Sequence, residues 1–342
     1  MTLDLGLGKP GPAVRIGRRS LGVAGVLVVL LLGFATAGIV LGDYPDSPAQ
    51  ALRALFGAGD DRLATIFVRD LRLPRVLAAI GVGVALGTSG GLLQAASDNV
   101  LSSPDLIGFT AGSATGAIVV IILLAGGPAE ISAGALVGGT GAAAVMYLLG
   151  FRRGAVTQQL VLVGVGLGAV LSAVNHLLLT RSSLDAAQTA AQWLAGSLNA
   201  VTWAEVDLLG PVLLVLVPSA LVLSRPLSLL ALGQETSLVL GSRPVLTRNL
   251  AVLLSVALAS VATATTGPVA FVALASAQIA RRLTRAPGPN LAVSALTGAV
   301  LVLGCDVIGR HLTGSDLPVG VVTGTLGGVY LVWLLRRERG LR

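Results

Sequence analysis

The stretch Leu71–Gln94, "LRLPRVLAAIGVGVALGTSGGLLQ", places two arginines around a proline and then continues from Val76 to its end without a charged side chain. An uncharged apolar run of about 18 residues or more can cross the hydrocarbon core of a bilayer as an α-helix. Pro74 lacks a backbone donor, so it suits the first turn of such a helix. The stretch therefore predicts a membrane-spanning helix that begins beside two cations, Arg72 and Arg75.

The whole chain has the composition of a membrane protein. Hydrophobic residues make up 54% of the 342 residues and charged residues 11%, whereas soluble domains carry about 25% charged residues. We expect an all-α integral membrane protein with about ten transmembrane helices in one compact domain, residues 1–342, because the 45 glycines let helices approach closely. The expected spans are Leu21–Leu41, Val76–Gln94, Ile107–Ala125, Ile131–Leu149, Gln159–Leu179, Val206–Leu223, Leu250–Thr265, Val269–Ile279, Leu291–Ile308 and Val319–Leu335.

The basic residues predict the orientation of these spans. With a basic N-terminus (residues 1–20) on the cytoplasmic side, 16 of the 23 Lys and Arg residues also fall on that side, as the positive-inside rule requires. Both termini are then cytoplasmic, and Arg72, Arg75 and Arg310 lie outside. This bias accounts for the net charge of +7 without a nucleic-acid partner. Ala35-Thr36-Ala37 could end a cleaved signal peptide, but the run before it is long enough to remain as a membrane anchor.

Two loops have apolar faces that need a partner. The predicted cytoplasmic loop 224–249, "SRPLSLLALGQETSLVLGSRPVLTRN", contains two short helical stretches that are separated or ended by Gly233 and Gly241. Its leucines either fold onto the bundle or bind a cytoplasmic protein. On the outer side, residues 184–205 predict a short surface helix, or an aromatic anchor at the membrane interface through Trp193 and Trp203.

The expected spans offer little chemistry of their own. No phosphate-binding GxxxxGK[ST] motif occurs, and His176 is the one ionisable residue well inside a predicted span, so energy for transport must come from another subunit. The two histidines and single cysteine make no metal site or cofactor site. Four neutral polar residues in or near the spans either bond neighbouring helices or line a translocation path; they are Gln94, Thr110, Ser113 and Asn175.

Several motifs, in order along nearly the whole chain, resemble the permease subunits of ABC importers for iron-siderophores and vitamin B12. Within that family they look most similar to ferric enterobactin-type permeases. The motifs are "LRLPR" with "GVALGTSGGLLQ", "DNVLSSPDLIGFTAGSATGA" (98–117), "QWLAGSL" (192–198), "LALGQETSLVLG" (230–241), "GPVAFVALASAQIARRLTR" (267–285) and "DLPVGVVTGTLGGVYLVWLL" (316–335).

The resemblance implies a non-catalytic subunit with four kinds of partner besides membrane lipid. These are a second permease subunit (identical or related), an ATP-hydrolysing subunit on the cytoplasmic side, an extracytoplasmic substrate-binding protein and a ferric siderophore as substrate. It also implies that Arg72 and Arg310, with Arg75 beside them, pair with carboxylates of the binding protein, as guanidinium groups do well. Contact with the ATPase is implied for Gly233, Gln234, Glu235 and Gly241.

Other interpretations remain open at this point. Arg72 and Arg75 could instead extend toward lipid headgroups. The substrate could be cobalamin or haem rather than a ferric siderophore. A gradient-driven carrier would transport without any ATPase and would not need the 224–249 loop, and a non-transporting membrane scaffold would not need polar residues inside its spans.

Overall fold

The structure is a computed structural model that describes residues 17–42, 44, 47–57, 61–105, 108–150, 158–286, 288–311 and 317–339. Some residues used in the sequence analysis lie outside this part of the chain. They are residues 1–16 of the predicted cytoplasmic N-terminus, Arg152 and Arg153 of a predicted inner loop, and Asp316.

The described chain folds into helices without a strand. Each predicted span coincides with a helix or with most of one. The elements are α1 (Arg18–Val40), α2 (Pro48–Phe56), α3 (Arg62–Thr65), η1 (Ile66–Arg72), α4 (Leu73–Ser97), α5 (Phe109–Val119), η2 (Val120–Leu124), α6 (Pro128–Gly150), α7 (Gln158–Arg181), α8 (Leu184–Leu194), α9 (Trp203–Val222), α10 (Ser224–Leu230), α11 (Gln234–Val239), α12 (Pro244–Thr266), α13 (Val272–Thr284), α14 (Leu291–His311) and α15 (Val319–Arg339).

Seven of the described helices are long and apolar enough to cross a membrane. Two shorter apolar helices, Phe109–Leu124 and Val319–Val332, add to them. Helix α13, at 13 residues, is about 20 Å long at 1.5 Å per residue. The number of ten spans therefore stays a prediction, while the all-α membrane fold is confirmed.

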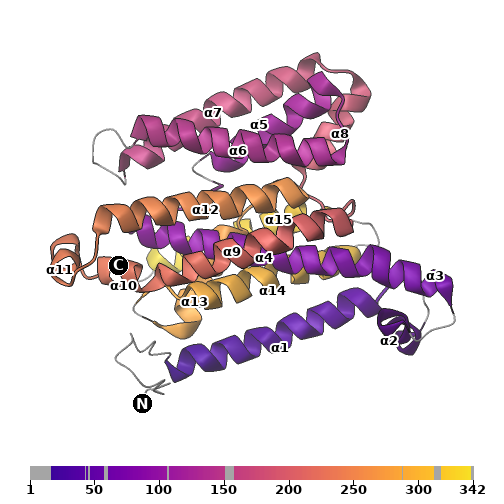
Figure 1. The fold of residues 1–342 in the computed structure, drawn as a ribbon, viewed down its shortest axis with the longest axis horizontal. Helices are drawn as coiled ribbons and strands as arrows, with labels where there is room; N and C mark the ends of the chain where they lie inside the picture. Colours follow the sequence, from indigo (N-terminus) through magenta and orange to yellow (C-terminus); the bar gives the residue numbers. More distant parts are fainter. Residues whose placement is uncertain are drawn as a thin grey trace.

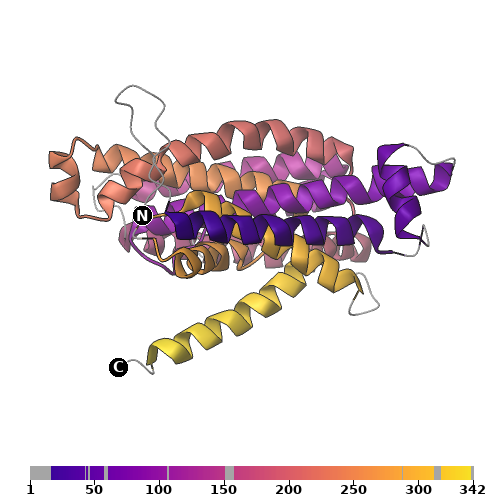
Figure 2. The same cartoon turned by 90° about the horizontal axis from the view of Figure 1, so that it is seen from below.

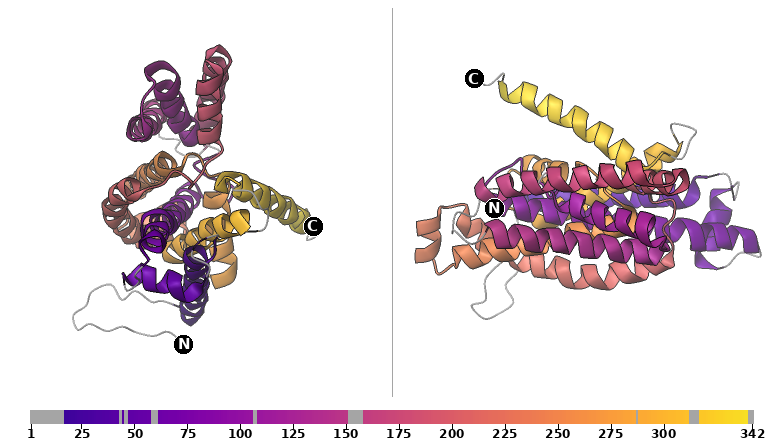
Figure 3. Two further views of the ribbon diagram at one scale, coloured as in Figure 1. Left: turned by 90° about the vertical axis from the view of Figure 1, so that its right-hand side faces the viewer. Right: turned by 90° about the horizontal axis from the view of Figure 1, so that it is seen from above.

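Helix α4, which contains the quoted stretch, is the centre of the bundle. It packs against α9, α12, α13 and α14, and Figure 1 shows these helices around it. In its apolar part 78% of the residues are buried, against 17% in α1, which lies at the edge. Helices α5 to α8 form a second group on the other side of α12, seen apart from the rest in the left view of Figure 3.

The bundle has two distinct ends, to which we refer as the hairpin end and the cap end. The hairpin end carries α10 and α11, and the cap end carries α2 and α3 (Figure 1). Helix α1 begins at the hairpin end, where Arg19 Nε donates a hydrogen bond of 2.7 Å to Leu283 O near the end of α13. Helix α15 contacts α13 and α14, and its C-terminal part points away from the bundle (Figure 2).

The second predicted span begins earlier than the sequence indicated. Pro74 does not start a helix, because α3, η1 and α4 run on without a break from Arg62 to Ser97. The turns just before Pro74 form the π-helical segment η1. A π-helical turn alters the hydrogen-bond ladder, which accommodates the proline's missing donor within a continuous helix.

The predicted outer helix 184–205 is shorter than expected. Helix α8 ends at Leu194, and α9 begins only at Trp203, after a Thr202–Glu205 capping box. The reason is Gly196, which has a left-handed φ of 67° and packs against the Pro268 carbonyl. Gly196 O also accepts a hydrogen bond of 3.0 Å from Gly320 N, so this turn joins α8 to the start of α15.

Glycines allow α4 and α14 to touch at the backbone. A Cβ atom on Gly83 would lie 2.5 Å from both Gly298 O and Ala299 Cα. Gly87 is equally tight against Ser294 O. Small residues at such contacts are the usual way in which membrane helices approach closely, so this contact fixes the two central helices relative to each other.

Candidate functional site

Arg72, predicted to meet a partner protein outside, points into the protein. The residue is 6% exposed. Its Nη1 donates to Ile39 O at 2.9 Å and its Nη2 donates to Tyr44 O at 2.6 Å. Gly42, with a φ of 147°, lies directly against the guanidinium. Arg72 therefore ties the end of α1 to the start of α4.

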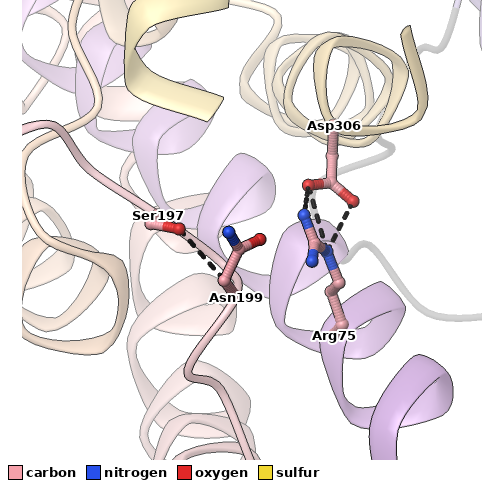
Figure 4. Close-up of polar contacts among 4 residues, drawn as sticks. All are labelled: Arg75, Ser197, Asn199 and Asp306. Carbon is pink, nitrogen blue, oxygen red and sulfur yellow. Dashed lines mark hydrogen bonds and ion pairs between the residues drawn. The ribbon is translucent and has the colours of Figure 1, made fainter. Parts of the chain in front are cut away.

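Arg75 pairs with Asp306, a partner that the sequence analysis did not connect with it. Arg75 Nη2 donates to Asp306 Oδ1 at 2.7 Å, and Nε donates to Oδ2 at 3.0 Å (Figure 4). The two side chains are 11% and 2% exposed. The pair links α4 to α14 at their cap ends, so the charge of each residue is neutralised inside the bundle.

Beside this ion pair lies the turn that follows α8. Figure 4 shows Ser197 and Asn199 next to the pair. Ser197 Oγ accepts from Asn199 N at 3.1 Å, while Ser197 N donates to Thr266 O at 2.8 Å. Asn199 is exposed. The predicted docking residue Arg310 lies half-buried in the last turn of α14 at the same end. At the cap end the neutral Ser197 and Asn199 thus lie beside a neutralised ion pair, and Arg310 adds a cation.

The hairpin formed by α10 and α11 carries the residues predicted to contact an ATPase. Gly233 starts α11 with φ 102° and ψ 153°, a conformation that is open almost only to glycine. Gly241 follows α11 with a φ of 79°. Gln234 and Glu235 are exposed, and Ser237 is buried. Ser242 N donates to Ser237 O at 2.9 Å, which closes the end of α11.

The apolar side chains of this hairpin mostly face outward. Leu230 is 8% exposed and belongs to the core, but Leu232 is 60% exposed and Val239 is 87% exposed. Leu238 and Leu240 are each 54% exposed. The interpretation in which the apolar face folds onto the bundle thus fits α10, where Leu227 and Leu230 are buried and Leu229 is half-buried, but not α11 or the turn before it.

The four predicted path residues lie at different helix contacts. Gln94 Nε2 donates to Leu274 O of α13 at 3.1 Å, and Thr110 Oγ1 donates to Asp105 O at 3.5 Å. Ser113 faces Gly139 of α6, and Asn175 is on α7. Within the described chain, Gln94 Oε1, Ser113 Oγ and Asn175 Oδ1 are buried without a hydrogen-bond partner. The structure does not bring these four residues into one cluster.

Sequence reasoning missed how the segment between α4 and α5 packs: it is exposed at 98–101 and buried at 102–104. After α4 the chain turns back along α13, so that Gln278 Nε2 donates to Val100 O at 2.8 Å. Further on, Asp105 Oδ2 accepts from Phe271 N at 3.2 Å, at the start of α13. A carboxylate there is favourable, because the N-terminus of a helix carries partial positive charge. Non-helical backbone at membrane depth must be buried in protein or line a cavity.

No metal centre can be built from the described residues. Among them, no three or more His, Cys, Asp or Glu side chains lie close enough to hold an ion. The single cysteine, Cys305, is buried in α14.

Comparisons with known proteins place this geometry among transport permeases. The profile of the FecCD transport family matches residues 27–337. The ferric enterobactin transport system permease of Escherichia coli (strain K12) is 38% identical over 95% of this chain and 98% of its own length. The achromobactin transport system permease of Dickeya dadantii (strain 3937) is 37% identical over 95% and 92%. A solved metal-chelate type ABC transporter in an inward-facing conformation aligns with a TM-score of 0.83 at 27% identity, over 93% of this chain and 99% of the other.

Proposed function

The chain belongs to the FecCD transport family, and on that premise we propose that it is the permease subunit of an ABC importer that carries a ferric siderophore across the cytoplasmic membrane. The relatives named for ferric enterobactin and achromobactin support this substrate class. The hairpin end, where α1 begins, faces the cytoplasm, and the cap end faces outward. Energy comes from a separate ATP-hydrolysing subunit.

One observation carries the proposal: the exposed apolar face of the α10–α11 hairpin. Val239, Leu232 and Leu238 lie on a short projecting element that the bundle does not cover. Large apolar side chains gathered and exposed on one projecting element favour a protein interface, and the hairpin is the part of the described chain that projects furthest at this end (Figure 1). We assign it to a groove in the ATPase, with Gly233, Gln234, Glu235 and Gly241 as turn and contact residues.

Transport in liposomes tests the function directly. We expect uptake of ferric enterobactin by the permease with its partner permease, ATPase and binding protein only when ATP is present on the hairpin side. The same assay with cobalamin or haem as competitor distinguishes the substrate classes. Uptake by the permease alone under a proton or sodium gradient would show a gradient-driven carrier and contradict the proposal.

Replacing Gly233 by valine should uncouple ATP hydrolysis from uptake of the substrate. A side chain at φ 102° is strained, at a cost of about 1–3 kcal/mol, so α11 shifts away from the position that fits the ATPase. We expect ATP-driven uptake to fall about tenfold or more while the assembled complex still hydrolyses ATP. Gly25→Val is the matched control, since nothing lies within 4 Å of a Cβ atom there. Normal uptake by Gly233→Val would rule out a coupling role for this turn.

At the cap end we propose that Arg310 helps a binding protein to dock. We expect Arg72 and Arg75 to contribute less to docking than the sequence suggested, because both side chains already make contacts inside the protein. Arg310→Glu should slow association with the binding protein several-fold at low salt, since rim charges act mainly on the association rate. Surface-immobilised binding protein and purified permease would give the rates. Arg285→Glu, at the opposite end, is the control, and equal rates for Arg310→Glu and wild type would refute the role.

The translocation path is proposed to lie between two permease subunits, identical or related. In this arrangement α15, which leaves the bundle in Figure 2, packs against the second subunit. Gln94, Thr110, Ser113 and Asn175 are at most local contributors to the path, because they belong to separate helix contacts within one chain.

A further inference from the structure

A cavity of about 420 Å³ lies at the hairpin end, between the α10–α11 hairpin and the bundle. Its walls come from the last turn of α4, the hairpin, the beginning of α12, the end of α13 and the loop before α14. Gln94, Asp98, Gln234, Arg248 and Arg281 supply its polar side chains. Small-molecule sites have this size and usually a few such polar groups.

One wall of the cavity supplies cations. Arg248 from α12 makes a single long hydrogen bond, 3.4 Å from its Nη1 to Gln234 Oε1. Arg281 from α13 makes no hydrogen bond through its side chain to the rest of the described chain, and neither arginine lies within 4 Å of a described carboxylate. Guanidinium groups are the preferred protein partners of phosphate. The two arginines therefore present donors that the described protein does not satisfy.

The α4 wall supplies one charged acceptor, Asp98, one helical turn after the buried Gln94. Gln94 is 1% exposed, and its Oε1 atom is buried without a partner in the described chain. Asp98 ends α4 in a left-handed conformation with φ 49°, which aspartate adopts more readily than most non-glycine residues. It also places a negative charge at the C-terminus of a helix, where cations are favoured. This placement of the charge is locally unfavourable, and a cationic donor in the cavity would offset it.

We propose that this cavity binds a phosphate ester that carries a primary ammonium group, as in a phosphoethanolamine headgroup. The phosphate meets Arg248, which is half-buried, and Arg281, which is exposed, and the ammonium donates to the exposed carboxylate of Asp98. A simple anion fits less well, because Asp98 repels it. The inference does not rest on the proposed function, although Gly233 and Gln234, assigned above to the ATPase contact, also line the cavity. It concerns a ligand that joins the hairpin to the bundle, whether that ligand is a membrane lipid or a soluble molecule.

Binding to the purified, delipidated full chain tests the proposal. Native mass spectrometry would compare dioleoyl phosphatidylethanolamine with phosphatidylglycerol and with phosphatidylcholine, whose quaternary amine has no N–H donor. We expect about tenfold tighter binding of phosphatidylethanolamine than of the other two lipids, as for the loss of one charge-assisted hydrogen bond. Soluble glycerophosphoethanolamine is the second arm: equal affinity identifies a soluble ligand, and affinity only with acyl chains identifies a lipid.

Variants separate this site from general contact with lipid. Asp98→Asn should reverse the headgroup preference, so that the protein binds phosphatidylglycerol more tightly than phosphatidylethanolamine. Arg281→Gln should weaken the binding of phosphatidylethanolamine about tenfold. Arg285 is an exposed neighbour that does not line the cavity, so Arg285→Gln should bind phosphatidylethanolamine with the affinity of the wild type. Arg281→Gln provides the cleaner of the two arginine tests, because Arg248 also contacts the hairpin. An unchanged headgroup preference in Asp98→Asn, or wild-type binding by Arg281→Gln, would overturn the proposal.

Discussion

Replacing Asp306 by alanine is expected to destabilise the protein by about 3–5 kcal/mol, because it leaves Arg75 charged and unpaired inside the bundle. The Arg75 side chain is only 11% exposed, and the carboxylate accepts hydrogen bonds from both its Nε and its Nη2. Alanine removes all of these acceptors at once. Thermal unfolding in detergent, followed by tryptophan fluorescence, measures the loss.

The double variant Arg75→Met with Asp306→Leu is the informative control. Apolar residues of similar volume often replace a buried ion pair at little cost. We therefore expect the double variant to be much closer to wild type than either single variant. If the stability losses of the single variants Asp306→Leu and Arg75→Met were additive in the double variant, the pair would contribute nothing as a pair, and its role would be limited to packing.

Replacing Gly83 by valine should destabilise the contact between α4 and α14 by about 3 kcal/mol or more. Overpacking a core costs about 1–3 kcal/mol even when side chains can adjust. Here the new Cβ atom would lie 2.5 Å from backbone atoms of Gly298 and Ala299, which cannot move without separating the two central helices.

The buried Cys305 gives a convenient measurement for this variant. It is the single cysteine of the chain and is 5% exposed in α14. Labelling by a thiol-reactive fluorophore therefore reports opening of the α4–α14 contact, and we expect it to start at lower temperature in Gly83→Val. Gly141→Val is the matched control, since its Cβ atom would meet nothing within 4 Å. Equal labelling of both variants would show that the central helices tolerate separation.

Sequence alone determined the long helices and their approximate places along the chain. Backbone groups inside a bilayer must be satisfied within their own segment, so long apolar runs fold as helices whatever their neighbours are. Residues 224–249 likewise revealed two short helices, because Gly233 and Gly241 interrupt an otherwise helical pattern at positions that do adopt positive φ. The family resemblance also came from the sequence, through local motifs in a fixed order.

Tertiary structure alone decided which groups meet. Asp306 lies 231 positions after Arg75, and the burial of Arg72, the return of the chain to Asp105 and the cavity beside Asp98 all depend on how the helices are rotated and shifted against one another. Apolar residues cover most sides of these helices, so hydrophobic periodicity does not identify the face that packs inward. That face is chosen by close contacts between small residues, such as Gly83 with Gly298, and such contacts become visible only when the helices are placed together.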